Sequence, residues 1–539
     1  MSICHHQTKA GSNNFAKRNS VYWLIVLILA LVPLPATAPR HLQAQAGLLA
    51  LATTAPTQTV RVIVQKATAL DAPEQAVGSL SGVVTRELGI INAFVAEVPA
   101  GVIPALAARR DVRWISLDAP VLSTAVSSHK SASPHRDDDD DNSDDDNRPH
   151  SLLNSYIPVI NADKAWKQGL QGQGITVAIV DSGITSHDDF KGIGGNLRIR
   201  EWVQYSNSQA YHPDDYYGHG SHIAGVVGGN GSLSGGAYVG VAPQVNFVNV
   251  KITNDHGAGA ISDVVAGLQW IYNNRTTHNI RVVNLSLNSS VAEPYHLSPL
   301  NAAVEILWFN GIVVVVSAGN NGTSSGGVLY PPANDPFVIT VGATKDGGTI
   351  PLNDDVVAPY SAYGVTPEGF AKPDLVAPGH NIVSLLGKPD AVLAQQHPGN
   401  RQADPVQSNY FYFRMSGTSV AAPMVAGAAA LLLQDEPNLT PDQVKYRLMT
   451  TANRQWQGYN AVKAGAGLLD IQAAVKGNST ASANTGLPAS QLLWSGTQPV
   501  TWNSVSWNSV SWNSVSWNSV SWNSVSWNSV SWNSDYWGP

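Results

Sequence analysis

The chain has 539 residues, of which 43% are apolar and 13% charged, and its formal net charge is −7. This length allows one large domain with smaller appendages, and the apolar content excludes a disordered chain. An aspartate-rich run at residues 136–148 carries eight negative charges, so the remainder is near neutral. It lacks the basic excess expected of a protein that binds nucleic acid or anionic membranes.

The N-terminal segment has the pattern of a secretory signal. An unbroken apolar run, VYWLIVLILALV, occupies residues 21–32, after basic residues and before small-residue sites. It is shorter than the roughly 20 residues that span a bilayer. We predict a signal peptide over residues 1–46 and a secreted protein, extracellular or associated with the cell surface; a retained membrane anchor is the alternative. Removal of the signal would also remove Cys4, the single cysteine, and leave a protein without disulfides.

A small domain is predicted next, over residues 57–127. Strand-like runs occupy residues 60–65, 94–99 and 112–117, and residues 102–110 have apolar side chains at helical spacing. Such a mixture is typical of a compact α+β domain.

A linker is predicted at residues 128–150, where the aspartate run lies. Blocks of like charge repel one another and remain solvated. We expect an acidic connector here; a calcium-binding role for the run is the alternative.

Residues 151–477 alternate strands with helices. The strand-like runs are rich in β-branched residues and too apolar to have one solvated face. Continuous apolar strands separated by helices indicate an α/β domain with a mostly parallel central sheet and helices on both faces. Ligands of such sheets bind beyond the carboxyl ends of the strands. The predicted strands are 175–180, 245–252, 281–287, 311–318 and 337–343, and the clearest helices are 261–274 and 299–310.

The C-terminal tail, residues 478–539, contains a WNSVS repeat in which tryptophan recurs every five residues from Trp502 to Trp532. A period of five matches neither a strand nor a helix. Three interpretations stay open: a segment that associates with a surface or with itself, a solenoid-like strip, and an expanded repeat without function.

Four polar residues stand at predicted strand ends or helix starts: Asp181, His219, Asn320 and Ser419. Acyl transfer needs such a set. A serine hydroxyl attacks only when an imidazole removes its proton, and a carboxylate must orient that imidazole. An asparagine amide and the backbone N–H of a serine at a helix start can stabilise the oxyanion.

The sequence around these residues resembles the subtilisin-like serine proteases. The blocks VAIVDSGI (177–184), HGSHIAG (219–225), VVSAGNNG (315–322) and GTSVAAPMVAG (417–427) are similar to the four signature blocks of that family and occur in the same order. A single block of this kind is weak evidence, whereas four in register are highly specific. The resemblance covers about residues 151–477.

The resemblance implies a subtilisin-like fold and a secreted serine endopeptidase that acts on proteins or peptides through an acyl-enzyme, with no cofactor required for the chemistry. Asp181 would orient the base, His219 would be the base, Ser419 the nucleophile and Asn320 the oxyanion donor. His222 would be a structural neighbour of the site.

Two further stretches resemble the strands with which the family pairs its extended substrate. Members of the family often have glycine at the position of Asn288. The larger asparagine side chain would narrow a substrate subsite there. Ordinary strand ends are the alternative interpretation. The residues are Gly257, Ala258 and Gly259 in the first stretch, and Ser286, Leu287 and Asn288 in the second.

Asp189 matches the position of a calcium ligand in the family. The loop that would supply further ligands, residues 228–243, carries a Gly/Ser-rich insertion. The resemblance therefore allows a structural calcium at Asp189, and an ordinary surface aspartate is the alternative.

The domain at residues 57–127 resembles the family's inhibitory prosegment, most closely over residues 91–121. This implies a small ferredoxin-like α+β prodomain that assists folding and acts as an intramolecular inhibitor until it is removed. Processing would then fall after residue 120.

Two rival functions fit the sequence less well. A metallohydrolase could use His219 and His222, three residues apart, with Asp214 or Asp215, but the HEXXH pattern is absent. A catalytically silent surface-binding protein of the same fold could use the tryptophan repeat, but none of the four catalytic positions is lost.

Overall fold

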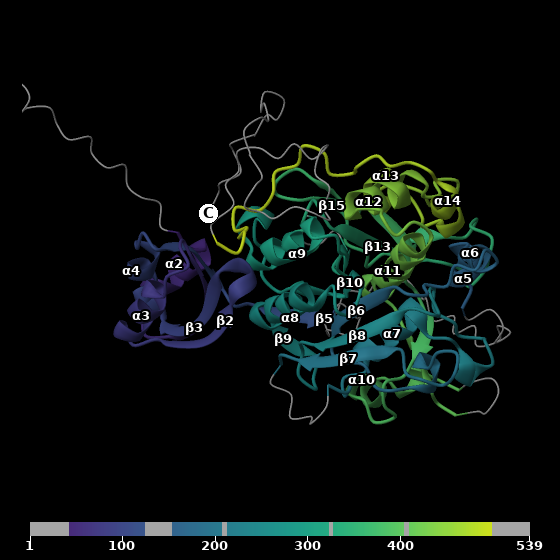
Figure 1. Cartoon of the computed structure of the whole chain (residues 1–539), viewed down its shortest axis with the longest axis horizontal. Helices are drawn as coiled ribbons and strands as arrows, with labels where there is room; N and C mark the ends of the chain where they lie inside the picture. The colour runs from purple at the N-terminus through teal and green to yellow at the C-terminus, as the bar shows by residue number, and fades with distance from the viewer. Residues whose placement is uncertain (1–42, 124–153, 207–212, 323–326, 404–408, 498–539) are drawn as a thin grey trace, which may run out of the picture. The chain divides into compact units, whose positions relative to one another are not determined.

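The computed structural model describes residues 43–123, 154–206, 213–322, 327–403 and 409–497 (Figure 1). The predicted acidic linker, the tryptophan repeat and most of the predicted signal lie outside these ranges. Their functions stay predictions.

The N-terminal domain contains a four-stranded antiparallel sheet of order β2-β3-β1-β4. Its elements alternate as βαββαβ, which is the ferredoxin-like α+β topology that was predicted. The strands are β1 (Thr59–Lys66), β2 (Val83–Leu88), β3 (Ala93–Pro99) and β4 (Val112–Leu117), and the helices are α2 (Ala46–Thr54), α3 (Ala72–Ser79) and α4 (Ile103–Ala107).

Both faces of this small sheet are covered. Val62 and Val64 belong to a core that the sheet shares with its own helices. Ile63 and Val95 belong instead to the large core that includes the peptidase domain. Since successive side chains of a strand point to opposite faces, one face packs inward and the other packs on the following domain.

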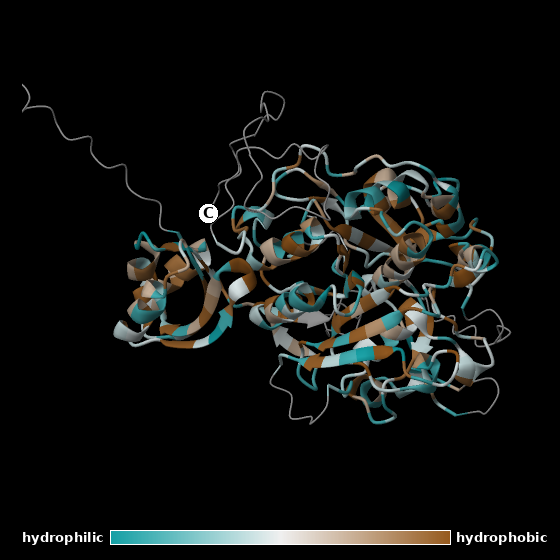
Figure 2. Cartoon of the chain, in the orientation of Figure 1, coloured by the Kyte–Doolittle hydropathy of each residue, from teal (hydrophilic) through white to brown (hydrophobic). Residues whose placement is uncertain are grey.

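The peptidase domain is built on an eight-stranded sheet of order β14-β13-β12-β10-β6-β8-β7, with β17 paired to β13. All pairs are parallel except β13 with β14. Figure 2 shows apolar residues along its central strands. The strands are β6 (Thr176–Asp181), β7 (Ile199–Gln204), β8 (Asn246–Lys251), β10 (Ile280–Leu285), β12 (Val313–Ser317), β13 (Ile339–Lys345), β14 (Val356–Val357) and β17 (Leu375–Pro378).

The five strands predicted for this domain are confirmed as β6, β8, β10, β12 and β13. Strand β7 was not predicted, because its sequence IREWVQ mixes charged and apolar residues and most of it is only half-buried. Within the described ranges it pairs with β8 alone, at the edge of the sheet. An edge strand needs less apolar surface than a central one.

Helices cover both faces of the sheet (Figure 1). Helices α8 (Ile261–Asn274) and α9 (Pro299–Phe309) pack together, as do α7 (His219–Gly228) and α11 (Thr418–Asp435). Among the described residues, α11 alone has the length and hydropathy of a membrane span, but it is almost wholly buried inside the fold. It is therefore a core helix.

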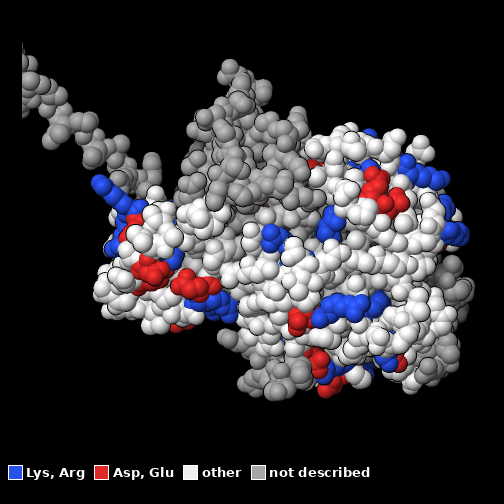
Figure 3. Space-filling model, in the orientation of Figure 1, with Lys and Arg blue, Asp and Glu red and all other residues white. Residues whose placement is uncertain are grey.

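The remaining elements are short and lie around this framework. The helices are α5 (Tyr156–Val159), α6 (Ala162–Trp166), α10 (Val392–Gln396), α12 (Pro441–Thr450), α13 (Ala461–Ala464) and α14 (Ile471–Lys476). The strands are β5 (Pro120–Ser123), β9 (Ala258–Ala260), β11 (Leu287–Ser289), β15 (Gly364–Val365), β16 (Ala371–Lys372), β18 (Ile382–Leu385), β19 (Arg401–Gln402) and β20 (Tyr412–Met415). On the face drawn in Figure 3, charged side chains are scattered among large uncharged areas.

Two predicted domain boundaries are wrong. The small domain begins by Gln43 rather than at residue 57, because Gln45 N donates to Ile115 O at 2.9 Å and helix α2 packs on the sheet. The peptidase fold continues past residue 477, because residues up to Trp494 are buried against it. Both errors come from segments that have little periodicity of their own and are held by long-range contacts.

Candidate active site

Asp181 and His219 form a buried pair at the carboxyl edge of the sheet. Asp181 is the last residue of β6, and His219 is the first residue of α7. His219 Nδ1 lies 2.8 Å from Asp181 Oδ1, and both side chains are almost fully buried. Because the carboxylate accepts the proton of Nδ1, the basic lone pair is on Nε2. Nε2 has no hydrogen-bond partner among the described residues, so it can accept a proton.

A second buried carboxylate, Asp215, organises the start of α7. Its Oδ1 accepts from Gly218 N at 2.7 Å and from Ser182 Oγ at 2.8 Å, and its Oδ2 accepts from Ser221 N at 2.7 Å. Burial raises the pKa of Asp215, and these donors oppose the rise. The sequence indicates Asp215 only as a candidate metal ligand and does not predict this role. An acidic residue a few positions before a predicted helix start is a signal that could have indicated it, because the first N–H groups of a helix lack partners within the helix.

The glycine between His219 and Ser221 is required by close packing. A Cβ at Gly220 would lie 2.2 Å from Gly183 O, in the turn that follows Asp181. Gly220 N also donates to Ser182 Oγ at 2.9 Å. The backbone of α7 therefore lies directly against the turn after β6, which brings His219 to Asp181.

Ser419 is the second residue of α11, and Asn320 is hydrogen-bonded to its neighbour Thr418 at the start of that helix. Asn320 follows β12, and its Oδ1 accepts from Thr418 N at 2.8 Å and from Thr418 Oγ1 at 2.9 Å. Ser286 Oγ donates to Ser419 O at 2.7 Å. Since the amide oxygen of Asn320 is held by Thr418, its NH2 group is turned to the other side of the amide. There it can donate to an oxyanion formed beside Ser419.

The two predicted substrate strands lie on either side of a segment of the chain itself. Strand β5 pairs antiparallel with β9 and with β11. In this register Val121 is opposite Gly259 and Ser289, and Leu122 is opposite Ala258 and Asn288. Both stretches therefore pair with an extended segment.

The flanking residues of these strands are also placed. Gly257 precedes β9 with φ of +80°, and a Cβ there would meet the ring of Tyr217. Asn288 is 7% exposed, and with its amide oriented to satisfy its hydrogen bonds it donates to Ser317 O at 3.3 Å. Its side chain therefore reaches toward β12 rather than into solvent.

His222 lies one turn after His219 and has a different environment. Its Nε2 lies 3.1 Å from Ile382 O and 3.0 Å from Phe413 O, so that it connects β18 and β20. Burial and the neighbouring His219 lower the pKa of His222 to about 3. It is a neutral structural residue, as the sequence reasoning expected.

Metal binding by the neighbouring acids does not fit this geometry. Both oxygens of Asp215 accept from donors of the protein, and Asp214 pairs with Lys388 at 2.9 Å. Among the described residues, no group of three or more His, Cys, Asp or Glu could hold a metal ion.

The residues around Asp189 do not fit a calcium site either. Asp189 Oδ1 accepts from Ser232 Oγ at 3.0 Å and from Leu233 N at 2.9 Å. Asp189 Oδ2 accepts from Tyr412 OH at 2.8 Å. Two of these donors come from the Gly/Ser-rich insertion, which thus satisfies the carboxylate that a metal would need.

A guanidinium group lies beside Asp189. Arg198, which is 3% exposed, donates to Val245 O and Gly228 O at 2.6 Å and to Asp189 O at 2.9 Å. Burial lowers the pKa of Arg198 to about 10, which leaves it charged at neutral pH. The charged guanidinium of Arg198 therefore donates hydrogen bonds to all three of these carbonyl groups.

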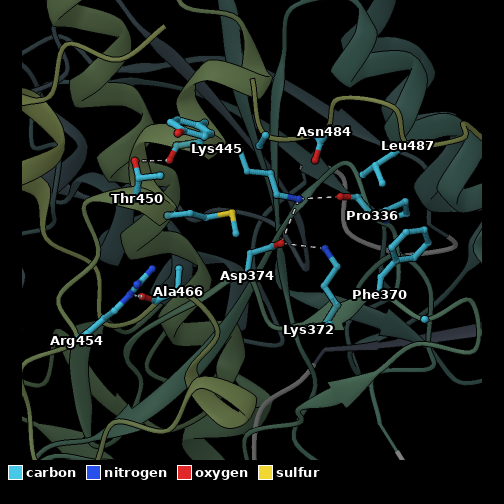
Figure 4. A pocket seen from close by; sticks show the side chains of 15 residues that line it. Pro336, Phe370, Lys372, Asp374, Lys445, Thr450, Arg454, Ala466, Asn484 and Leu487 are labelled. Carbon is cyan, nitrogen blue, oxygen red and sulfur yellow. Dashed lines mark hydrogen bonds and ion pairs between the residues drawn. The ribbon is translucent and has the colours of Figure 1, made fainter. Parts of the chain in front are cut away.

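A cavity of about 460 Å³ lies away from the candidate active site, near the amino ends of β13 and β17 (Figure 4). At its base, Lys445 Nζ donates to Pro336 O at 2.7 Å and pairs with Asp374 at 3.2 Å, and Lys372 pairs with Asp374 at 2.9 Å. Two buried lysines therefore share the carboxylate of Asp374.

Comparisons with known proteins identify the family to which the chain is similar. A family model described as "Subtilase family" matches residues 172–468. Serine protease AprX of Bacillus subtilis is 39% identical over 334 residues, 61% of this chain and 72% of AprX. Subtilisin DY of Bacillus licheniformis is 33% identical over 322 residues, 59% of this chain and 97% of that protein.

Among solved structures, the chain resembles fervidolysin of Fervidobacterium pennivorans, a keratinolytic enzyme related to subtilisin. The TM-score is 0.57 and the identity 25%. The match covers 78% of this chain and 61% of fervidolysin, so the chain spans less than two thirds of that protein.

Proposed function

Because the chain belongs to the subtilase family and is a serine endopeptidase, we propose that Asp181, His219 and Ser419 are its catalytic triad. The observation that carries the proposal is the 2.8 Å contact between Asp181 Oδ1 and His219 Nδ1. It leaves Nε2 of the imidazole available as the base.

In this mechanism Ser419 Oγ attacks the carbonyl carbon of the scissile peptide bond while His219 Nε2 takes the hydroxyl proton. The imidazolium is stabilised by Asp181. The oxyanion receives hydrogen bonds from the Asn320 amide and from the backbone N–H of Ser419 at the helix start. His219 then returns the proton to the leaving amine. In the second half of the reaction, water attacks the acyl-enzyme while His219 takes its proton, and His219 returns that proton to Ser419 Oγ as the acid product leaves.

We also propose that residues 43–123 are an inhibitory prosegment. Strand β5 occupies the space between β9 and β11, where an extended substrate would pair. Asp118 supports this arrangement, because its two oxygens accept from Ser262 N at 2.8 Å and from Ser262 Oγ at 2.7 Å. Arg61 pairs with the same carboxylate at 2.8 Å.

The full chain is then a latent proenzyme that processes itself after Ser123, in residues outside the described ranges. Substrates are proteins or peptides that add as a strand between β9 and β11, so that main-chain hydrogen bonds provide most of the affinity. Asn288 narrows one subsite of this cleft. The enzyme is secreted. The signal is cleaved before Gln43, because residues 43–46 take part in the folded prosegment.

The test compares the full chain with Ser419→Ala, and uses Ser416→Ala as a matched serine substitution three residues earlier. We expect the wild type and Ser416→Ala to hydrolyse casein and to lose the prosegment, as N-terminal sequencing would show. Ser419→Ala should do neither. Equal casein hydrolysis by Ser419→Ala and the wild type would exclude the proposed nucleophile.

A further inference from the structure

The segment that follows the last helix of the peptidase domain is anchored along its length. Asn484 Nδ2 donates to Asp442 Oδ1 at 2.7 Å. Ser490 N donates to Glu305 Oε2 at 2.7 Å. Gln491 N donates to His296 O at 2.9 Å. These partners belong to the peptidase domain, so the segment remains with the enzyme when the prosegment leaves.

The three residues after this anchor are apolar and buried. Leu492 and Leu493 are each 2% exposed, and Trp494 is 7% exposed. We call residues 492–494 the C-terminal strap. A strap with no helix or strand of its own becomes this buried only when other segments cover it.

The small N-terminal domain provides part of that cover. Gln65 on β1, which is 1% exposed, donates through Nε2 to Leu492 O at 2.5 Å. Arg113 on β4 donates through Nη1 to Leu493 O at 2.9 Å. Burial lowers the pKa of Arg113 to about 10, so the charged form persists at neutral pH and makes a charge-assisted hydrogen bond.

Apolar side chains of both domains also belong to one large buried cluster. Leu492 and Leu493 belong to the same buried cluster as Ile63 and Ile91 of the small domain. The 3-10 helix η1 (Gly89–Ile91) contacts α9, and Ile90 N donates to Gln269 Oε1 on α8 at 2.9 Å. The small domain therefore contacts the peptidase domain through the face of its sheet that points away from its own helices.

From these contacts we propose that the C-terminal strap of the enzyme is a second docking site for the prosegment, separate from the cleft that β5 occupies. This inference rests on the proposed inhibitory role of residues 43–123. After cleavage behind Ser123, the strap slows release of the cut prosegment, because the hydrogen bonds from Gln65 and Arg113 must break and the two leucines must lose their cover before the prosegment can dissociate. The strap thereby sets how long the processed enzyme stays latent.

The first experiment compares two truncations of the full chain. Ending the chain after Gly496 keeps the strap and removes the tryptophan repeat, whereas ending it after Gln491 removes the strap as well. The measurements are the lag before full hydrolysis of a chromogenic peptide, and the fraction of cut prosegment that co-elutes with the enzyme in gel filtration. Ending the chain after Gly496 should leave both unchanged.

Ending the chain after Gln491 should shorten the lag about tenfold or more, because burial of a single leucine already contributes more than that factor to a binding constant. The final hydrolysis rate per active enzyme should be unchanged. An unchanged lag in this truncation would overturn the proposal.

A second pair of variants decides the question if the shorter chain does not fold. Arg113→Met removes the hydrogen bond to Leu493 O and leaves the strap intact, and Arg110→Met changes an exposed arginine of the same domain. Only Arg113→Met should shorten the lag, and equal lags in the two variants would overturn the proposal. A wild type that shows no lag and no bound prosegment would instead refute the inhibitory role itself, which distinguishes the two failures.

Discussion

The two ends of the central sheet both bury charged groups, but they use them differently. At the carboxyl end, Asp181 and His219 are paired, and Nε2 of the imidazole is without a partner among the described residues. At the amino end, Lys445 contacts three backbone carbonyls and Asp374, whose other oxygen accepts from Lys372. A buried group that is fully satisfied stabilises the fold, whereas chemistry needs one with a lone pair still available.

The strongest test of this comparison is His219→Ala. It should lower kcat on the order of 10⁶-fold, a magnitude measured on subtilisin, a relative of this chain. His222→Ala changes a histidine on the same helix and should retain most of the activity of the folded enzyme. Comparable losses in the two variants would show that the difference between the histidines is not functional.

At the opposite end, Lys445→Met should destabilise the fold by about 1–3 kcal/mol, because Pro336 O loses its buried donor while Asp374 keeps Lys372 as its cation. Denaturant unfolding measures this loss, and Lys476→Met, at an exposed lysine, is the control. The folded fraction of Lys445→Met should keep its kcat/KM. A large fall in kcat/KM at unchanged stability would contradict the conclusion that the amino end stabilises the fold and the carboxyl end performs the chemistry.

Titration of His222 should have a smaller, pH-dependent effect on the stability of the fold. Its pKa is about 3 in the fold against an ordinary value near 6.5, so between these values the unfolded chain binds the extra proton. Its contribution to stability is therefore complete above pH 6.5 and declines as the pH falls toward 3, by at most about 1.4 kcal/mol per pH unit. His222→Gln should flatten the stability–pH curve in this window. An unchanged slope would mean that His222 does not titrate as described.

The smallest effect is expected from removal of metal ions. Since protein donors already satisfy the Asp189 carboxylate, and Arg198 donates to three backbone carbonyls beside it, a chelator should leave the Tm of the wild type unchanged at this site. Arg198→Met should lower the Tm, because three carbonyl groups lose their donor. A chelator-induced fall in Tm that Asp189→Asn abolishes would show that calcium binds there after all.

The sequence by itself determined the central strands, the two long helices beside them, and the four signature blocks. Runs such as VVVVS in β12 and the helical spacing of ISDVVAGLQWIYNN in α8 are local patterns, and local patterns are readable without a structure. The order of Asp181, His219 and Ser419 was likewise visible as motif and spacing.

Only the tertiary structure decided the partners of residues that lie far apart in the chain. No periodic pattern in the sequence predicts three of these features: the carbonyls around Arg198, the capping of α7 by Asp215 and the covered strap at residues 492–494. Gln65 and Leu492 lie 427 positions apart, and yet they are joined by a hydrogen bond. Such contacts depend on how the sheets stack and on which faces remain uncovered, and that is decided when the whole chain packs.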